Sequence, residues 1–296
     1  MKNFEVEDRF LTPALSINCR GRLVDLSEPV VMGIVNVTPD SFYEGSRVTS
    51  LDKVLARVEQ ILDEGGRMVD IGACSTRPGA DDVSEEEEGN RLWPVLKAIR
   101  NRWPDILLSV DTFRGKIAQK AVNDYGVDII NDISAGMLDA SMFEIVAGLN
   151  VPYVLMHMKG TPGNMQNNPV YSDVTGEVIL FLAEKVDQLR ALGVSDIIID
   201  PGFGFGKNIE HNFRLLNELE QFKMFEFPLL VGLSRKSMIY KHLDGTPDNS
   251  LNGTTVLNTL ALSRGANILR VHDVKEAVEC VKLVSKTIKR DLYDIS

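Results

Sequence analysis

The stretch DIIIDPG, residues 196–202, decides the fold of this 296-residue chain. Its apolar run is short, does not alternate with polar residues, and ends at an aspartate followed by Pro and Gly. A run of this kind is typical of a parallel β-strand covered on both faces. Seven further runs share the pattern: VVMGIVNV (30–37), MVDIGA (68–73), ILLSVDT (106–112), VDIINDI (127–133), PYVLMHM (152–158), PLLVGLS (228–234) and NILRVHD (267–273).

Amphipathic stretches lie between these runs, and those at residues 51–65 and 176–193 predict helices. Eight strand–helix units without a Pro- or Ser-rich linker predict an α/β protein in which residues 1–296 form one (β/α)8 TIM barrel domain. An open, doubly wound sheet is the alternative. Residues 14–29 alternate around Gly21, which predicts an N-terminal β-hairpin that covers the barrel floor.

Composition narrows the class of protein further. The formal net charge of −10 argues against a general nucleic-acid or membrane-surface binder. No apolar run approaches the ~18 residues of a membrane span. The cysteines Cys19, Cys74 and Cys280 show no C-x-x-C spacing, so we expect a reducing compartment and no structural zinc. These features favour a cytoplasmic protein whose partners are small molecules.

The glycines of IIIDPGFGFGK, residues 197–207, suggest a phosphate loop, but their spacing does not fit one. Asn208 stands where a P-loop requires Ser or Thr, and the third glycine of G-x-G-x-x-G is missing. We therefore expect the functional residue to be Asp200. Pro201 and the glycines would turn the chain so that its backbone passes close to a flat ligand.

Polar residues stand at nearly every expected strand end, where the mouth of such a barrel carries its chemistry. Polar groups inside a core cost free energy unless they are paired, so together these residues predict a site. Taken singly, Asp111 also suits a helix N-cap, and His157 also suits packing inside the barrel. The set comprises Asn36, residues 75–77, Asp111, Asn131, His157, Asp200, residues 234–236, Arg270 and His272.

The chemistry of these residues falls into two groups. Asp111, Asn131, Asp200 and Lys236 offer acceptors, an amide and a cation, which suit a guanine-like or pterin-like ring with adjacent N–H and amine donors. An internal Asp–Lys ion pair is the alternative interpretation for two of them.

The second group suits an anionic ligand. Arg270 and His272 are two positions apart on one strand, so they point to the same face and suit a pyrophosphate. Asn36 heads a loop in which Asp40 could share a Mg²⁺ ion with phosphate oxygens.

The motifs together resemble those of the dihydropteroate synthase family. In chain order they are MGIVNVTPDSF, DIGACSTRPGA, SVDT, INDIS, LMHMKGTPGNMQ, IIIDPGFGFGK, LVGLSRKS and LRVHDV, and they cover the chain from about residue 14 to its end. The resemblance implies a (β/α)8 barrel that forms homodimers. It implies a transferase of folate biosynthesis that joins para-aminobenzoate to 6-hydroxymethyl-7,8-dihydropterin pyrophosphate, releases pyrophosphate and forms 7,8-dihydropteroate.

The resemblance also implies roles for individual residues. The pterin would be held by Asp111, Asn131, Asp200 and Lys236. Pyrophosphate would be held by Asn36, Arg270 and His272, with Asn36 as the protein ligand of Mg²⁺. The aminobenzoate site, where sulfonamide drugs compete, would be bordered by Thr76, Arg77, Pro78, Phe205 and Ser234. Catalysis would rest on Asp111, Lys236, Arg270 and His272, and the first loop would close through Asp40, Ser41 and Phe42.

Three alternative functions fit parts of the same pattern. A corrinoid methyltransferase domain has a similar barrel and binds a pterin, although Arg270-x-His272 and the STRPGA loop favour pyrophosphate and aminobenzoate chemistry. A Schiff-base aldolase would use Lys236 as its nucleophile. A catalytically silent pterin-binding protein would not need Arg270, His272 or the first loop.

Overall fold

The computed structural model describes residues 15–37, 47–74, 83–161, 163–165 and 168–288. Within these ranges, eight parallel strands form one sheet in the order β8-β7-β6-β5-β4-β3-β10-β9. A parallel bridge between Ile199 and Leu229 joins the two edges, so the sheet closes into a barrel and the open-sheet alternative is excluded. The strands are β3 (Val30–Asn36), β4 (Met68–Gly72), β5 (Leu107–Asp111), β6 (Ile129–Asp132), β7 (Tyr153–Met156), β8 (Ile197–Asp200), β9 (Leu230–Val231) and β10 (Ile268–Val271).

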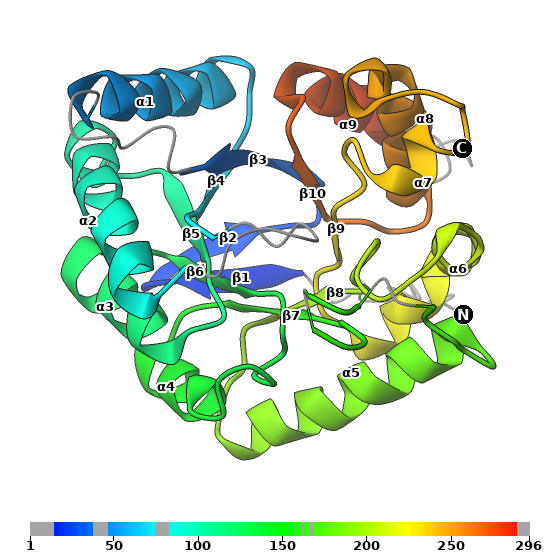
Figure 1. Cartoon of the computed structure of the whole chain (residues 1–296), viewed down its shortest axis with the longest axis horizontal. Helices are drawn as coiled ribbons and strands as arrows, with labels where there is room; N and C mark the ends of the chain where they lie inside the picture. Colours follow the sequence, from blue (N-terminus) through cyan, green and yellow to red (C-terminus); the bar gives the residue numbers. More distant parts are fainter. Residues whose placement is uncertain (1–14, 38–46, 75–82, 162, 166–167, 289–296) are drawn as a thin grey trace, which may run out of the picture.

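Helices follow the strands and surround the barrel (Figure 1). The Ser84 side chain caps the second one by accepting from the Glu87 amide at 3.1 Å, as expected for an acidic first helical turn. The helices are α1 (Arg47–Asp63), α2 (Glu85–Arg102), α3 (Gly115–Tyr125), α4 (Met142–Leu149), α5 (Val174–Ala191), α6 (Ile209–Asn217), α7 (Ser237–Tyr240), α8 (Leu251–Ser263) and α9 (Val274–Ile288), with the short 3₁₀ turns η2 (Leu219–Phe225) and η3 (Pro247–Asn249).

The expected N-terminal hairpin consists of β1 (Ser16–Cys19) and β2 (Arg22–Asp25). It lies at the barrel floor, because its hydrogen bonds reach residues that precede the strands. The Asn18 amide donates to Asp196 Oδ1 at 2.8 Å, just before β8. Asn267 Nδ2 donates to the Leu26 carbonyl at 3.1 Å, just before β10.

The buried apolar side chains of the strands form two sets, because successive residues of a strand point to opposite faces of the sheet. One set points outward and packs against the helices, as Val69, Leu108 and Leu269 do. The other set fills the lower barrel and meets Ile17, Val24 and Leu26 of the hairpin. Every strand contributes to this inner layer, β3 with both Val30 and Met32 and the others with one residue each: Met68, Leu107, Ile129, Val154, Ile198, Leu230 and Ile268. Positions two or four residues further along most of these strands therefore face the mouth.

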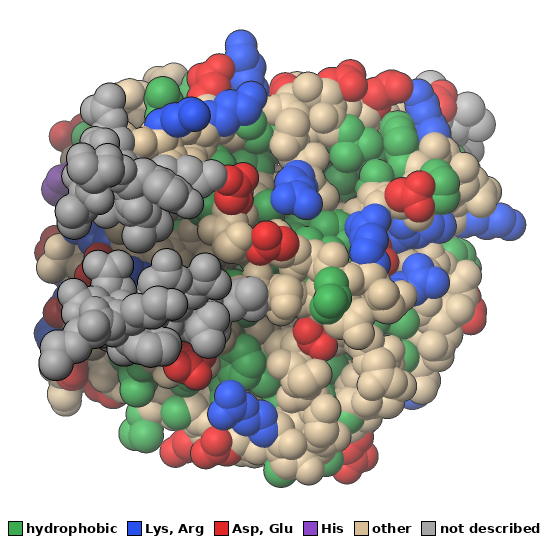
Figure 2. All heavy atoms as spheres, turned by 180° about the vertical axis from the view of Figure 1, so that it is seen from behind, with side chains coloured by type: hydrophobic (Ala, Val, Ile, Leu, Met, Phe, Trp, Pro, Cys, Tyr) green, Lys and Arg blue, Asp and Glu red, His purple; other side chains and the backbone are tan. Residues whose placement is uncertain are grey.

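The surface carries charges of both signs. On the face drawn in Figure 2, acidic and basic side chains are both present, with hydrophobic side chains among them. Among the described residues, no helix combines the length and the apolar character that crossing a membrane requires.

Candidate active site

The mouth of the barrel collects the polar residues that share the inward parity. Asn36, Asp111 and Asn131 lie in one row across neighbouring strands, joined through Gly72 of β4. A Cβ at position 72 would lie 3.4 Å from the Asp111 Cβ, an ordinary van der Waals contact, so Gly72 lies directly beside the Asp111 side chain. The strand register thus brings together residues that are far apart in the sequence.

An ion network centred on Arg270 occupies the middle of this mouth. Arg270 Nε donates to Asp70 Oδ2 and Arg270 Nη2 donates to Asp111 Oδ2, both at 2.7 Å. Asn131 Nδ2 also donates to Asp70 Oδ2 at 3.0 Å, and the Ser109 hydroxyl donates to Asp70 Oδ1 at 2.5 Å. Asp70 is completely buried, so these donors supply the compensation that an interior carboxylate needs.

Burial and charge act against each other in this network. Burial raises the pKa of Asp111 to about 7, although the neighbouring Arg270 charge lowers it. Burial alone would lower the pKa of Arg270, but the Asp70 and Asp111 charges outweigh it and leave the pKa raised. Arg270 is therefore a fixed cation, and its charge offsets part of the cost of burying the Asp111 carboxylate.

Asp200 and Lys236 meet at the loop that follows β8. Asp200 is buried, and its Oδ1 accepts from the Gly202 amide at 2.7 Å. Lys236 Nζ donates to the Phe203 carbonyl and lies 4.8 Å from the centroid of the Phe205 ring. Burial lowers the pKa of Lys236 to about 8, with the Asp200 charge opposing that shift. Lys236 thus bonds to the loop backbone, and its interaction with Asp200 is one between nearby charges.

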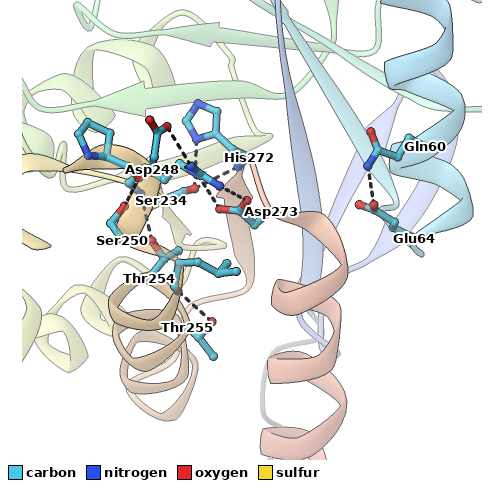
Figure 3. Close-up of polar contacts among 12 residues, drawn as sticks. Gln60, Glu64, Ser234, Asp248, Ser250, Thr254, Thr255, His272 and Asp273 are labelled. Atoms are coloured by element: carbon cyan, nitrogen blue, oxygen red, sulfur yellow. Dashed lines mark hydrogen bonds and ion pairs between the residues drawn. The ribbon is translucent and has the colours of Figure 1, made fainter. Parts of the chain in front are cut away.

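His272 is held by the neighbouring loop after β9 (Figure 3). Its Nδ1 lies 3.1 Å from the Ser234 hydroxyl, which also accepts from the His272 amide at 3.1 Å. Arg235 forms a bidentate pair with Asp273, Nε to Oδ2 at 2.9 Å and Nη2 to Oδ1 at 2.7 Å. This pair joins the two loops although Arg235 adopts a left-handed φ of 55°, and it fixes Ser234 and Lys236 on either side of Arg235.

Asn36 fits the protein side of a magnesium site. It ends β3 at the mouth with an exposed side chain, so its amide oxygen is available to a cation. Mg²⁺ takes oxygen ligands and commonly keeps few of them from the protein, the rest being water or substrate phosphate. Among the described residues, no three His, Cys, Asp or Glu side chains gather into a metal cage.

Some expected residues lie outside the described ranges, so the structure gives no account of them. They are Asp40, Ser41 and Phe42 in the first loop and Thr76, Arg77 and Pro78 in the second. The remaining expected site residues all lie at the C-terminal ends of the strands or in the loops that follow. The helix-cap interpretation of Asp111 is wrong, because α3 begins at Gly115 after its N-cap Arg114.

Sequence reasoning missed several residues of the mouth. Asp70 and Ser109 have the same parity as Met68 and Leu107, so a charge at an inward position of a buried strand was the available signal. A small apolar cluster at the mouth was also missed. Its members are Ile133, Met156, Met158 and Met165, with Phe113 and Phe205 packed against them.

Fold and site together define a barrel enzyme with its charged groups at the C-terminal strand ends. Residues 32–272 match the family model described as pterin binding enzyme. The dihydropteroate synthase of Haemophilus influenzae is 42% identical over 275 residues, which cover 92% of this chain and 99% of that protein. The Escherichia coli K12 dihydropteroate synthase is 41% identical over 276 residues, covering 93% and 97%.

Solved structures give the same result. The Yersinia pestis dihydropteroate synthase in a sulfonamide drug complex is 42% identical, with a TM-score of 0.87 and coverage of 93% of this chain and 100% of that one. The Xanthomonas albilineans dihydropteroate synthase with 4-aminobenzoic acid is 38% identical, with a TM-score of 0.85 and coverage of 93% and 98%. The chain belongs to the pterin-binding enzymes and, among them, to the dihydropteroate synthase family.

Replacing Asp70 by asparagine tests the ion network. Asp70→Asn keeps the volume of the side chain but removes the negative charge that fixes Arg270 Nε. It also places an NH2 group where Asp70 accepts from Arg270 and Asn131. We expect the affinity for inorganic pyrophosphate, measured by calorimetry, to fall by about tenfold or more, because a mispositioned guanidinium loses bidentate geometry. The exposed Asp63→Asn on α1 is the control. A folded Asp70→Asn protein with unchanged pyrophosphate affinity would contradict the role of Asp70.

Proposed function

We propose that the protein joins para-aminobenzoate to 6-hydroxymethyl-7,8-dihydropterin pyrophosphate, releasing pyrophosphate and forming 7,8-dihydropteroate in folate synthesis. The observation that carries this proposal is the gathering of Asp111, Asn131, Asp200, Lys236 and Arg270 at one barrel mouth. The family membership and the relatives described above support it.

The pterin ring would be bound by the half of the mouth that contains Asp200. A buried carboxylate accepts two adjacent donors from one edge of a flat ring in a bidentate pair. The Asp200 carboxylate is held in place by the Gly202 amide, which leaves its remaining acceptor sites for the ring. Asn131 can read a donor and an acceptor, while Asp111 would lie near the ring N–H and Lys236 would meet a ring acceptor.

The pyrophosphate group would be bound by Arg270, His272 and Asn36. A guanidinium has five N–H donors, and the contacts with Asp70 and Asp111 use two of its nitrogens. The remaining N–H groups and the His272 ring suit phosphate oxygens. Mg²⁺ held by Asn36 and those oxygens would neutralise charge on the leaving group.

The reaction would be an SN1-like substitution at the pterin methylene. The C–O bond to pyrophosphate breaks with its electron pair leaving on oxygen, and Arg270 and His272 stabilise that charge. The Asp111 carboxylate favours the positive charge that spreads over the ring. The aminobenzoate nitrogen then forms the new C–N bond and loses a proton to solvent, and no strong general base is required because an arylamine is neutral at pH 7. Phe205 and Ser234 would border the aminobenzoate.

An assay with both substrates tests the reaction directly. We expect pyrophosphate release only when dihydropterin pyrophosphate, para-aminobenzoate and Mg²⁺ are all present, with 7,8-dihydropteroate as the product. Borohydride trapping of a carbonyl substrate on Lys236 would instead indicate the aldolase. No pyrophosphate release from the complete mixture would overturn the proposed function.

Replacing Asp200 by asparagine tests the assignment of the ring. Asp200→Asn keeps the shape of a side chain that is only 6% exposed but removes the carboxylate that accepts two donors. We expect the affinity for a pterin lacking pyrophosphate to fall by at least about tenfold in calorimetry, since one hydrogen bond to a charged group is worth that ratio. Asp187→Asn on the exposed side of α5 is the matched control. Equal pterin affinity of the Asp200→Asn and Asp187→Asn proteins would show that Asp200 does not bind the pterin ring.

We also infer that the protein forms a homodimer, through the outer faces of α8 and α9. These helices pack against each other and expose Val256, Leu260 and Leu283, with Leu283 71% accessible. Light scattering should give twice the chain mass of 32.9 kDa. Leu260→Asp should shift the protein toward the monomer, and Leu180→Asp on α5 should not. A monomer at micromolar concentration would contradict this interface.

A further inference from the structure

Lys207 is a basic side chain placed inside the protein, with an exposed fraction of 2%, and burial lowers the pKa of its amino group well below the usual value. Its Nζ donates to the carbonyl of Gly202 at 2.9 Å and to the carbonyl of Phe205 at 3.2 Å, and it lies 2.8 Å from Nδ1 of His157. An ammonium group has three hydrogens and no acceptor, so three acceptors account for all of them. Burying such a group costs free energy unless it is hydrogen-bonded, so the three contacts offset the cost of placing Lys207 inside the protein.

His157 is suited to be the third acceptor. Its ring is buried, and burial together with the Lys207 charge lowers its pKa to about 2, which keeps the imidazole neutral. A neutral imidazole protonated on Nε2 presents Nδ1 as an acceptor toward Lys207. His157 is thus a packing residue, but it lies between the strands and α5 rather than inside the barrel, with its ring centroid 4.9 Å from that of Phe181. It is also bonded to the glycine-rich loop through Lys207.

The three contacts fix the shape of that loop, residues 201–208. Gly202 and Gly206 have φ values of 72° and 64°, and the loop presses against the segment after β7. A Cβ at Gly202 would lie 1.8 Å from the His157 carbonyl oxygen, and one at Gly206 would lie 2.3 Å from the Lys159 carbonyl oxygen. Lys207 reaches back to carbonyls within its own loop, so the loop cannot change shape without breaking these bonds.

The same loop supplies contacts to two site residues. The Phe203 carbonyl accepts from Lys236 Nζ, and the Phe205 ring lies against that ammonium group. A Cβ at Gly204 would lie 3.3 Å from Lys236 Cδ, so the loop backbone also limits the path of the lysine stem. The Gly202 amide orients Asp200. In contrast, the network of Arg270 with Asp70 and Asp111 lies on other strands.

We propose that Lys207 is a positioning residue: it sets the loop that orients Asp200 and Lys236 and places Phe205, without touching a substrate. This inference rests on the proposed function and adds a residue to it. Loss of Lys207 should weaken binding of the pterin ring and of aminobenzoate but not of pyrophosphate, because the first two sites depend on the loop and the pyrophosphate site does not.

Lys207→Met tests this role, since methionine keeps an unbranched side chain and removes every donor. We expect the calorimetric affinity for a pterin lacking pyrophosphate to fall about tenfold and the KM for para-aminobenzoate to rise by a similar factor, the ratio expected for a lost buried hydrogen bond. The affinity for inorganic pyrophosphate should stay within about twofold and also shows that the variant is folded. Lys223→Met on the exposed side of η2 is the matched control.

A pair of variants at His157 covers the case in which Lys207→Met does not fold. His157→Leu removes one acceptor and should produce a smaller loss in the same two quantities. His157→Asn should restore them, because the asparagine Oδ1 takes a position close to that of Nδ1.

Two further results would overturn the positioning role. Parallel weakening of all three ligands would indicate general structural damage. Unchanged pterin affinity and an unchanged KM for para-aminobenzoate in a folded Lys207→Met protein would show that Lys207 does not position the loop. In that case, activity of the wild-type protein would leave the proposed function intact. Failure of the wild-type protein to bind a pterin would instead count against the proposed function itself.

Discussion

The contact of Arg270 with Asp70 and Asp111 is the interaction on which the mouth of the barrel depends. Three charges inside a barrel are tolerated only because they compensate one another, and removing Arg270 would leave both carboxylates without their cation. Gly72 lies beside Asp111, while Ser109 and Asn131 donate to Asp70. Residues from β4, β5, β6 and β10 therefore depend on one another for their hydrogen bonds and for the balance of their charges.

The positive charge of Arg270 also reaches the other half of the mouth. Burial raises the pKa of Asp200, and the Lys236 charge and then the Arg270 charge oppose that shift. The Arg270 charge also adds to burial in lowering the pKa of Lys236. The two halves would bind different parts of the proposed substrate, yet they share this electrostatic centre. A change at Arg270 is consequently felt by groups that do not touch it.

The sequence predicted every strand of the barrel, because each apolar run is long enough to cross a layer and ends at a polar residue. The spacing of Arg270 and His272 also predicted one shared face. What it did not predict were pairings between residues far apart in the chain. Asp70 and Arg270 are 200 positions apart, on the two strands that flank β3, and Lys207 and His157 are 50 apart, in the loops that follow the neighbouring strands β8 and β7. The order of the strands in the sheet brings both pairs together.

The hairpin at the barrel floor determines from which end of the barrel a ligand can reach the site. Among the described residues, Ile17, Val24 and Leu26 pack against the inner layer of the strands and close the lower end of the barrel with apolar side chains. A ligand that reaches the polar residues of the mouth therefore approaches from the C-terminal ends of the strands.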